Sequence, residues 1–223
     1  MLTEEEGIEV VVTRLPVEAD AVRASATVLS VAERHRAHRF VLDRDRRHFI
    51  ARRAHLRRLL GERLGVPPAS VELVYGARGK PALARRFTGS ALRFNLSHCG
   101  DLAVYAFSSR TDVGIDVEAI RVVDEADQIA ATSFSGREQE MYRGLSAGDK
   151  PLGFLNGWTR KEAFVKAIGA GLSYPLDSFD VSLAPGEPAK ILRVEHTDGD
   201  GGWRIGSFFP APGFLAAVVN MPS

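Results

Sequence analysis

Residues 114–118 have the sequence GIDVE, in which apolar and acidic residues alternate. This alternation predicts a β-strand over residues 113–117. Because successive side chains of a strand point to opposite faces, Asp116 and Glu118 project from the same face. Two carboxylates that lie close together repel each other unless a cation sits between them. Mg²⁺ prefers such oxygen ligands, so the strand is a candidate metal site, and an exposed strand that merely carries two acids is the alternative.

Residues 158–166, WTRKEAFVK, have the spacing of a helix. Trp158, Glu162 and Lys166 recur every four residues, which places them on one helical face. If that face meets the acidic strand, Glu162 becomes a third carboxylate, and Lys166 can reach a phosphate that the metal holds. The alternative is a surface Glu–Lys pair beside a packed tryptophan.

Residues 95–98, NLSH, end a predicted strand and enter a turn. Backbone N–H groups, the Ser97 hydroxyl and the His98 imidazole can all donate hydrogen bonds to phosphate oxygens at such a position. A purely structural Ser-His pair is the alternative for this motif.

The composition indicates a globular protein. The chain has 223 residues, 45% hydrophobic and 26% charged, which is enough to bury a sizeable core and excludes a collagen-like or coiled-coil chain. No apolar run approaches the length of a membrane-spanning helix, and the acidic start, MLTEEEGIEV, lacks the profile of a signal peptide. A single cysteine, Cys99, fits a reducing compartment. We therefore expect a cytoplasmic protein with no membrane contact.

Charge is distributed unevenly along the chain, although 29 basic side chains nearly balance 28 acidic ones. Eleven arginines and three acids lie between residues 34 and 63, whereas eight carboxylates and two arginines lie between residues 112 and 140. A basic surface near a carboxylate-rich region suggests a polyanionic ligand on one side and a divalent cation on the other. The alternative is a solvated, arginine-rich helix face.

The order of predicted elements suggests two comparable halves. Hydrophobic periodicity predicts a strand over 8–15, helices over 22–40 and 45–64, and strands over 71–75, 93–96 and 102–107. After the acidic strand it predicts helices over 126–134, 136–145 and 154–168, and strands over 179–183, 191–195, 203–209 and 215–219. Each half runs from helices into strands, with a boundary near 108–112, although the sequence shows no repeat of fixed period.

The motifs occur in a specific order. Gly79-Lys80-Pro81, then 94–98 (FNLSH), 114–118 and 158–166, followed by 171–179 (GLSYPLDSF), resemble the Sfp-type 4′-phosphopantetheinyl transferases from about residue 36 to residue 181. The resemblance implies an α+β fold with two similar α/β subdomains related by a pseudo-twofold, here residues 1–109 and 110–223, and an active site in the cleft between them. It also implies transfer of the phosphopantetheine arm of coenzyme A to a serine of an apo carrier protein, with Mg²⁺ and release of 3′,5′-ADP.

The resemblance also implies roles for individual residues. Asp116, Glu118 and Glu162 match the metal-binding acids, and Lys166 matches the lysine that contacts the pyrophosphate. Glu162 is also a candidate general base for the carrier serine, directly or through a metal-bound water, although metal coordination would lower its basicity.

Further matches place the coenzyme A. Ser97 and His98 match phosphate-contacting positions; Gly79, Lys80 and Pro81 match the loop beside the adenine; and Arg36 matches a basic contact to the 3′-phosphate. Two positions depart from the family pattern, because Glu33 stands where some members have lysine and Phe49 where some have threonine. Arg47 or His48 is expected to take over that phosphate contact.

Two other functions compete with the transferase. A nucleic-acid-binding module would use the arginine-rich helix and would not need the three acids. A Mg²⁺-dependent phosphohydrolase of a dinucleotide-like substrate would share the acids but would position a water. The transferase hypothesis further predicts a monomer that binds coenzyme A and an acyl, peptidyl or polyketide carrier but no nucleic acid, with Mn²⁺ as the alternative metal.

Overall fold

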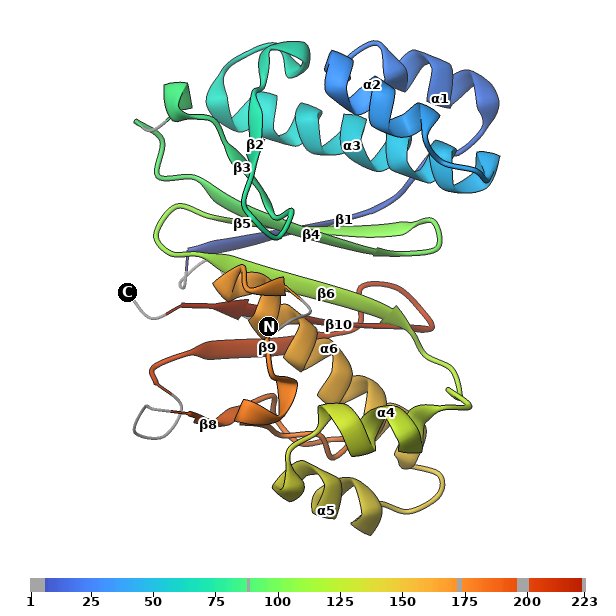
Figure 1. Ribbon diagram of the computed structural model, residues 1–223, viewed down its shortest axis with the longest axis vertical. Coiled ribbons are helices and arrows are strands. Elements are labelled where there is room, and N and C mark those ends of the chain that lie inside the picture. Colours follow the sequence, from blue (N-terminus) through green and yellow to red (C-terminus); the bar gives the residue numbers. More distant parts are fainter. Residues whose placement is uncertain (1–6, 88, 172–173, 196–200, 222–223) are drawn as a thin grey trace.

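A computed structural model describes residues 7–87, 89–171, 174–195 and 201–221. The protein is an α+β protein, as predicted (Figure 1). The first half contains β1 (Ile8–Arg14), α1 (Ala19–Ala26), α2 (Val31–His38), α3 (Asp43–Leu64), η2 (Pro68–Ser70), β2 (Leu73–Tyr75), β3 (Pro81–Leu83), η3 (Arg85–Phe87), β4 (Arg93–Cys99) and β5 (Leu102–Ser108). The second half contains β6 (Val113–Ala119), α4 (Ala126–Ser133), α5 (Gly136–Gly144), α6 (Lys150–Ile168), η5 (Leu176–Ser178), β7 (Phe179–Val181), β8 (Ile191–Val194), β9 (Arg204–Phe208) and β10 (Phe214–Asn220).

The two halves repeat one order of elements. Each has a strand, three α-helices, a two-stranded sheet and two further strands, in that sequence. The main sheets have the orders β1-β5-β4 and β6-β10-β9, so in each the last strand of the half lies in the centre, and all pairs are antiparallel. This repetition supports the predicted division at residues 109–110, which stays a prediction.

The core has two layers, one on each face of β5, because successive side chains of this strand point to opposite faces. Its sequence, LAVYAFS, is apolar except at the last residue, and all seven residues are buried. Ala103, Tyr105 and Phe107 pack against α3, whereas Leu102 and Val104 pack against β6 and β10 of the second sheet. The two sheets therefore lie face to face, with α1 to α3 on the outside of the first and α6 across the second (Figure 1).

The contact between β6 and α6 depends on Gly114. A Cβ atom at this position would lie 2.0 Å from the Ala163 carbonyl oxygen and 2.3 Å from the Ala167 nitrogen. Only glycine therefore lets the helix lie directly on the strand that carries Asp116.

The structure differs from the predicted elements in three places. The strand predicted over 93–96 continues as β4 to Cys99, so Ser97 and His98 lie within the strand, opposite Val104 and Ala103, and not at a turn. The single helix predicted over 22–40 is two helices, α1 and α2, because Ser30 forms a capping box that starts a new helix. Its hydroxyl accepts a hydrogen bond from the Glu33 N–H (3.2 Å), and its own N–H donates to the Glu33 carboxylate (2.9 Å). A further strand, β3, which the sequence did not predict, pairs with β2 in a short hairpin. None of the helices in the described residues has the length and apolarity needed to cross a membrane.

Candidate active site

Side chains from both halves meet where β4, β6 and α6 come together. The Lys166 ammonium on α6 lies 2.6 Å from Oδ1 of Asp116 on β6. The Ser97 hydroxyl on β4 donates to the same oxygen at 2.8 Å and accepts from Lys166 at 3.1 Å. The helical face that carries Lys166 therefore does meet the acidic strand, and the NLSH motif joins them.

The three predicted metal acids influence one another electrostatically. Burial raises the pKa of Glu118, and the charges of Asp116 and Glu162 raise it further, against the opposing charge of Lys166. Burial also raises the pKa of Glu162, where Lys166 opposes and Asp116 adds to the shift. The three carboxyl groups, called the acidic cluster below, are thus coupled electrostatically to one another and to Lys166, and of the three Asp116 is the one paired with the ammonium.

Two oxygens of this cluster lack a hydrogen-bond donor. Oδ2 of Asp116 and Oε1 of Glu162 are buried, and no described residue donates to either. A buried carboxylate oxygen without a partner is costly, and a hard divalent cation is one group that satisfies it. As the side chains stand, no group of three or more His, Cys, Asp or Glu residues in the described part of the chain is placed to hold a metal ion. The donor chemistry fits such an ion, while Lys166 competes with it for Asp116.

A pocket of about 220 Å³ adjoins the acidic cluster. The β2–β3 hairpin, β4 and the end of α6 form its walls, with Arg78, Gly79, Lys80, Pro81, Asn95, Leu96, Val165, Lys166, Gly169 and Gly171. The predicted adenine loop, Gly79 to Pro81, therefore lines a cavity that ends at Lys166. The chain leaves α6 into this wall at Gly169, whose φ of +69° suits a glycine.

Lys80 ties the hairpin to the second half rather than pointing freely into the pocket. Its ammonium donates to the carbonyl oxygens of Ala167 (2.9 Å) and Val113 (3.4 Å). Burial lowers the pKa of Lys80. The Lys80 stem thus forms part of the pocket wall, while its charge holds the two halves together.

His98 lies at the edge of the site among cations. Its side chain keeps solvent exposure, yet surrounding protein removes part of its water shell, and Arg52, Lys166 and His48 add positive charge. Together these effects lower the pKa of His98 to about 4. The imidazole is therefore neutral near pH 7 in the ligand-free protein.

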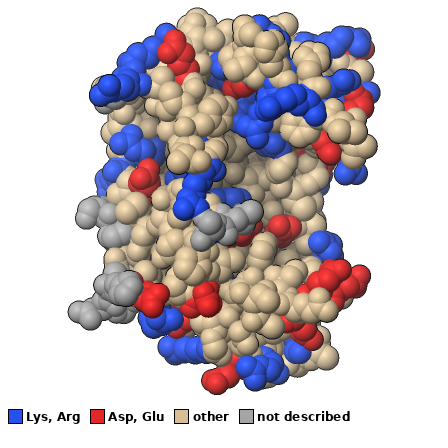
Figure 2. Space-filling model, in the orientation of Figure 1, with Lys and Arg blue, Asp and Glu red and all other residues tan. Residues whose placement is uncertain are grey.

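Arginines gather in the first half, beyond the acidic cluster. Figure 2 shows Lys and Arg side chains concentrated on this half and acidic side chains facing them across a hollow in the middle of the molecule. Arg36 lies over the ring of Phe49, 5.4 Å from its centroid. Arg52 and Arg53 each have a buried Nη1 to which no described residue offers an acceptor. Burial is the main cause that lowers the pKa of Arg52 to about 10, so the guanidinium still carries its charge near neutral pH.

Comparisons with known proteins decide the family. The family model "4′-phosphopantetheinyl transferase, N-terminal" matches residues 16–110, and the model "4′-phosphopantetheinyl transferase superfamily" matches residues 112–218. The 4′-phosphopantetheinyl transferase HetI of Nostoc sp. (strain PCC 7120) is 37% identical over 213 residues, which cover 95% of this chain and 87% of HetI. The chain belongs to the 4′-phosphopantetheinyl transferase family. It accordingly transfers phosphopantetheine from coenzyme A to carrier proteins, and the two competing functions are disfavoured.

Two further similar proteins match the transferase over a smaller share of both chains. The human L-aminoadipate-semialdehyde dehydrogenase-phosphopantetheinyl transferase is 33% identical over 181 residues, and the match covers 78% of this chain and 58% of the human protein. The solved structure of the Thermotoga maritima holo-[acyl-carrier-protein] synthase is 23% identical and covers 51% of this chain and 64% of that one, with a TM-score of 0.37.

The structure of the transferase explains both departures from the family pattern. Glu33 is buried and pairs with the buried Arg57, whose Nε lies 2.6 Å from the carboxylate, so Glu33 joins α2 to α3. Phe49 is buried beneath Arg36. Arg47, the expected substitute, already pairs with Asp43 at 2.5 Å one turn earlier in α3.

Sequence reasoning did not single out Arg52 and Arg53 among the arginines of the helix. The sequence did contain a signal for Arg53, because it follows the apolar residue Phe49 by one helical turn and therefore lies on the same face of the helix. In the structure Arg53 lies over the rings of both Phe49 and Tyr75, at 5.8 and 5.7 Å.

Proposed function

We propose that this transferase uses a divalent cation, Mg²⁺ or alternatively Mn²⁺, held by Asp116, Glu118 and Glu162. The observation that carries the proposal is the pair of buried, unpartnered oxygens on Asp116 and Glu162 beside the Lys166 ammonium. When bound, such a cation would neutralise charge on the pyrophosphate of coenzyme A and on the departing ADP oxygen.

Lys166, Ser97 and His98 bind the pyrophosphate in this proposal. Lys166 supplies a positive charge, and Ser97 and His98 supply neutral hydrogen-bond donors on the opposite wall. Because Ser97 already contacts both Lys166 and Asp116, a phosphate that enters here displaces hydrogen bonds that the site has formed within itself.

The transfer itself is a phosphoryl displacement. The carrier serine oxygen forms a bond to the phosphorus that bears the pantetheine arm, and the bond from that phosphorus to the ADP oxygen breaks, so 3′,5′-ADP leaves with the electron pair. The serine proton goes to a base, for which Glu162 is the candidate, directly or through water.

The adenine and the 3′-phosphate occupy the first half in this proposal. Gly79, Lys80 and Pro81 line the adenine pocket. Arg36 and the missed pair Arg52 and Arg53 hold the 3′-phosphate, because a phosphate oxygen provides the acceptor that the buried guanidinium N–H groups lack.

We propose that the partner is an apo carrier protein and that it docks on the basic first half. We also propose that the enzyme is a cytoplasmic monomer. Six arginines lie between residues 34 and 47. The loop before α3 adds two exposed apolar side chains, Val41 (97% exposed) and Leu42 (58% exposed). Such a surface suits an acidic partner that also exposes apolar side chains.

Mass spectrometry of a carrier tests the proposed function. The protein is incubated with coenzyme A, Mg²⁺ and a panel of apo acyl, peptidyl and polyketide carriers. We expect a gain of roughly 340 Da on one carrier serine, lost with EDTA and restored by Mg²⁺. Free phosphopantetheine formed without any carrier would instead indicate a phosphohydrolase, and intact coenzyme A with salt-sensitive DNA binding would indicate a nucleic-acid-binding module.

A further inference from the structure

Lys161 is a charged residue that the proposed chemistry does not use. It lies beside Glu162 in α6, yet its side chain is 0% exposed, as is that of its partner Glu138. An ammonium is buried in this way only when other groups replace its water. Its presence inside the second half therefore requires a structural or functional reason.

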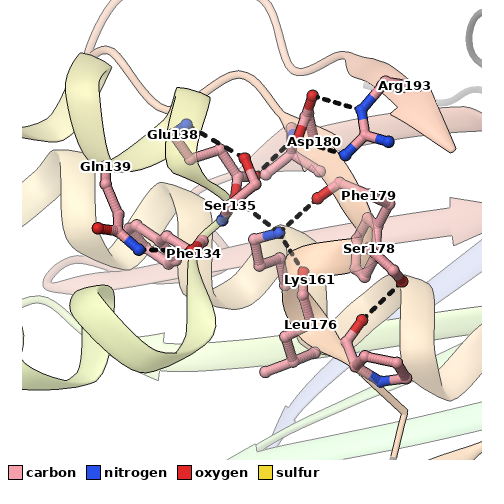
Figure 3. A network of polar contacts seen from close by, with 12 residues as sticks. Phe134, Ser135, Glu138, Gln139, Lys161, Leu176, Ser178, Phe179, Asp180 and Arg193 are labelled. Atoms are coloured by element: carbon pink, nitrogen blue, oxygen red, sulfur yellow. Dashed lines mark hydrogen bonds and ion pairs between the residues drawn. The ribbon is translucent and has the colours of Figure 1, made fainter. Parts of the chain in front are cut away.

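Three oxygens replace that water. The Lys161 ammonium donates to the carbonyl oxygens of Leu176 (2.6 Å) and Phe179 (2.7 Å) and lies 2.7 Å from Oε2 of Glu138 (Figure 3). An ammonium has three N–H donors, so all three are used.

Glu138 extends the network to two further segments. Its Oε2 accepts from the Ser135 N–H (2.7 Å) at the start of α5, and its Oε1 accepts from the Val181 N–H (2.8 Å) of β7. The pair thus joins α5, α6 and the η5–β7 segment (Figure 3).

The segment that Lys161 holds is the return of the chain from the pocket wall. Gly169, where α6 ends, and Gly171 lie in the wall of the 220 Å³ pocket. The Tyr174 N–H donates to the Gly171 carbonyl oxygen (3.0 Å), and Lys161 holds the chain shortly afterwards at Leu176 and Phe179. Neighbouring helix residues point about 100° apart. The anchoring of Lys161 on the inner side of α6 therefore also sets the rotation of the helix that directs Glu162 and Lys166 into the cleft.

We propose that Lys161 is a positioning residue for the coenzyme A site: its two carbonyl contacts hold the η5–β7 segment, which Tyr174 links to the pocket wall at Gly171, and they fix the rotation of α6. The inference rests on the proposed function, since it assigns a consequence for coenzyme A binding to that pocket. A merely structural lysine would affect folding and leave the affinity of the folded protein unchanged.

The test compares two charge-neutral double variants. In Lys161→Met/Glu138→Gln both charges are gone and no donor faces the carbonyls, whereas in Lys161→Gln/Glu138→Gln an amide keeps two N–H donors. Neither variant leaves a buried charge without a partner, which a single substitution would do. Lys150→Met is the matched control, because it removes a cation from the same helix, its partner Asp127 is 75% exposed and so is not left as a buried charge, and it does not line the pocket.

We expect the Met/Gln variant to melt cooperatively but to bind coenzyme A at least tenfold more weakly by calorimetry. Its KM for coenzyme A rises to match, while its KM for the carrier is unchanged. The Gln/Gln variant retains part of the affinity, and Lys150→Met equals the wild type. A folded Met/Gln variant with wild-type affinity overturns the inference.

Should the Met/Gln variant not fold, Lys161→Arg takes its place. The guanidinium keeps the charge, and it cannot reproduce the lysine geometry toward both carbonyls, so coenzyme A binding weakens; wild-type affinity in this folded variant overturns the inference. If instead the wild type binds coenzyme A but modifies no carrier, the proposed function fails while the binding comparison still decides the role of Lys161.

Discussion

The Lys166 ammonium lies 2.6 Å from Oδ1 of Asp116, so in the ligand-free protein a side chain holds the position beside the central acid that a metal ion needs. Glu162 shares this ammonium electrostatically, since Lys166 opposes the rise of its pKa. The site therefore balances part of its own negative charge with a lysine, and in the proposed function a cation and the pyrophosphate of coenzyme A would replace this internal pairing.

Removal of Lys166 separates its competition with a metal ion for Asp116 from its proposed contact with the pyrophosphate. We expect Lys166→Met to bind Mn²⁺ roughly tenfold more tightly in the absence of coenzyme A, because no ammonium competes for the carboxylate. The same variant binds coenzyme A more weakly because its pyrophosphate loses a cation. Electron paramagnetic resonance with Mn²⁺ and calorimetry with coenzyme A measure the two effects. Lys150→Met, at the exposed start of the same helix, serves as the control, and weaker Mn²⁺ binding by Lys166→Met would contradict this relationship.

Asp116→Asn preserves shape and removes the central charge. We expect turnover to fall by roughly 100-fold or more, since the oxygen shared by Lys166 and Ser97 no longer carries an anion that can hold a cation. Asp112→Asn is the matched control, because Asp112 precedes the same strand but is exposed and pairs with Arg93 at 3.7 Å. A quantitative carrier-modification assay on both folded variants checks this, and equal losses would place the site elsewhere.

Arg52→Gln tests the arginines that were missed. We expect the Kd for coenzyme A to rise about tenfold, in line with the loss of a charge-assisted hydrogen bond. The Kd for 3′-dephospho-coenzyme A should hardly change. Arg58→Gln, whose guanidinium is directed to Ser25 at 3.4 Å, should bind both ligands like the wild type. Equal weakening of both ligands in Arg52→Gln would argue against a 3′-phosphate contact.

His98 makes a pH-dependent contribution to stability. Its pKa is about 4 in the folded protein and 6.5 in an unperturbed chain. As the pH falls from 6.5 toward 4, His98 binds a proton in the unfolded chain but stays neutral in the folded protein, so the free energy of unfolding decreases. We expect His98→Gln to lose less stability than the wild type between pH 7 and pH 5 in urea titrations. The exposed His38→Gln should follow the wild type, and parallel curves for all three proteins would refute the assignment.

Salt tests the basic docking surface. We expect the KM for the carrier to rise as NaCl is added, because exposed charges are screened. Arg44→Glu, at a side chain that is 80% exposed, should raise the carrier KM by roughly two- to fivefold at low salt. Its KM for coenzyme A should stay constant. Arg137→Glu in the second half is the control, and an equal effect from it would show that the carrier does not prefer the first half.

Local pattern was sufficient for most elements and for which side chains share a face of the strand or of the helix. The alternation at Asp116 and Glu118 and the four-residue spacing of Glu162 and Lys166 depend only on backbone geometry, so the sequence already contains them. The split between α1 and α2 could also have been found, because Ser30 and Glu33 form a recognisable capping box.

Buried charges could not be predicted in the same way. Arg57 is buried because Glu33, on another helix, meets it, and Lys161 is buried because Glu138 and two carbonyl groups surround it. Each partner comes from a distant segment, and helical spacing alone places such side chains in solvent. The pairing of Lys166 with Asp116 likewise depends on how α6 lies on β6.

At Gly114 the main chain of β6 contacts the main chain of α6, and this contact sets the distance between the helix and the strand at the candidate active site. A single methyl group would wedge α6 away from the sheet, and Glu162 and Lys166 would move off together while Asp116 stayed behind. Every functional group would still be present, ionised and correctly ordered along the chain. Replacement of one glycine hydrogen atom by a methyl group could therefore inactivate the enzyme, although Gly114 takes no part in the chemistry.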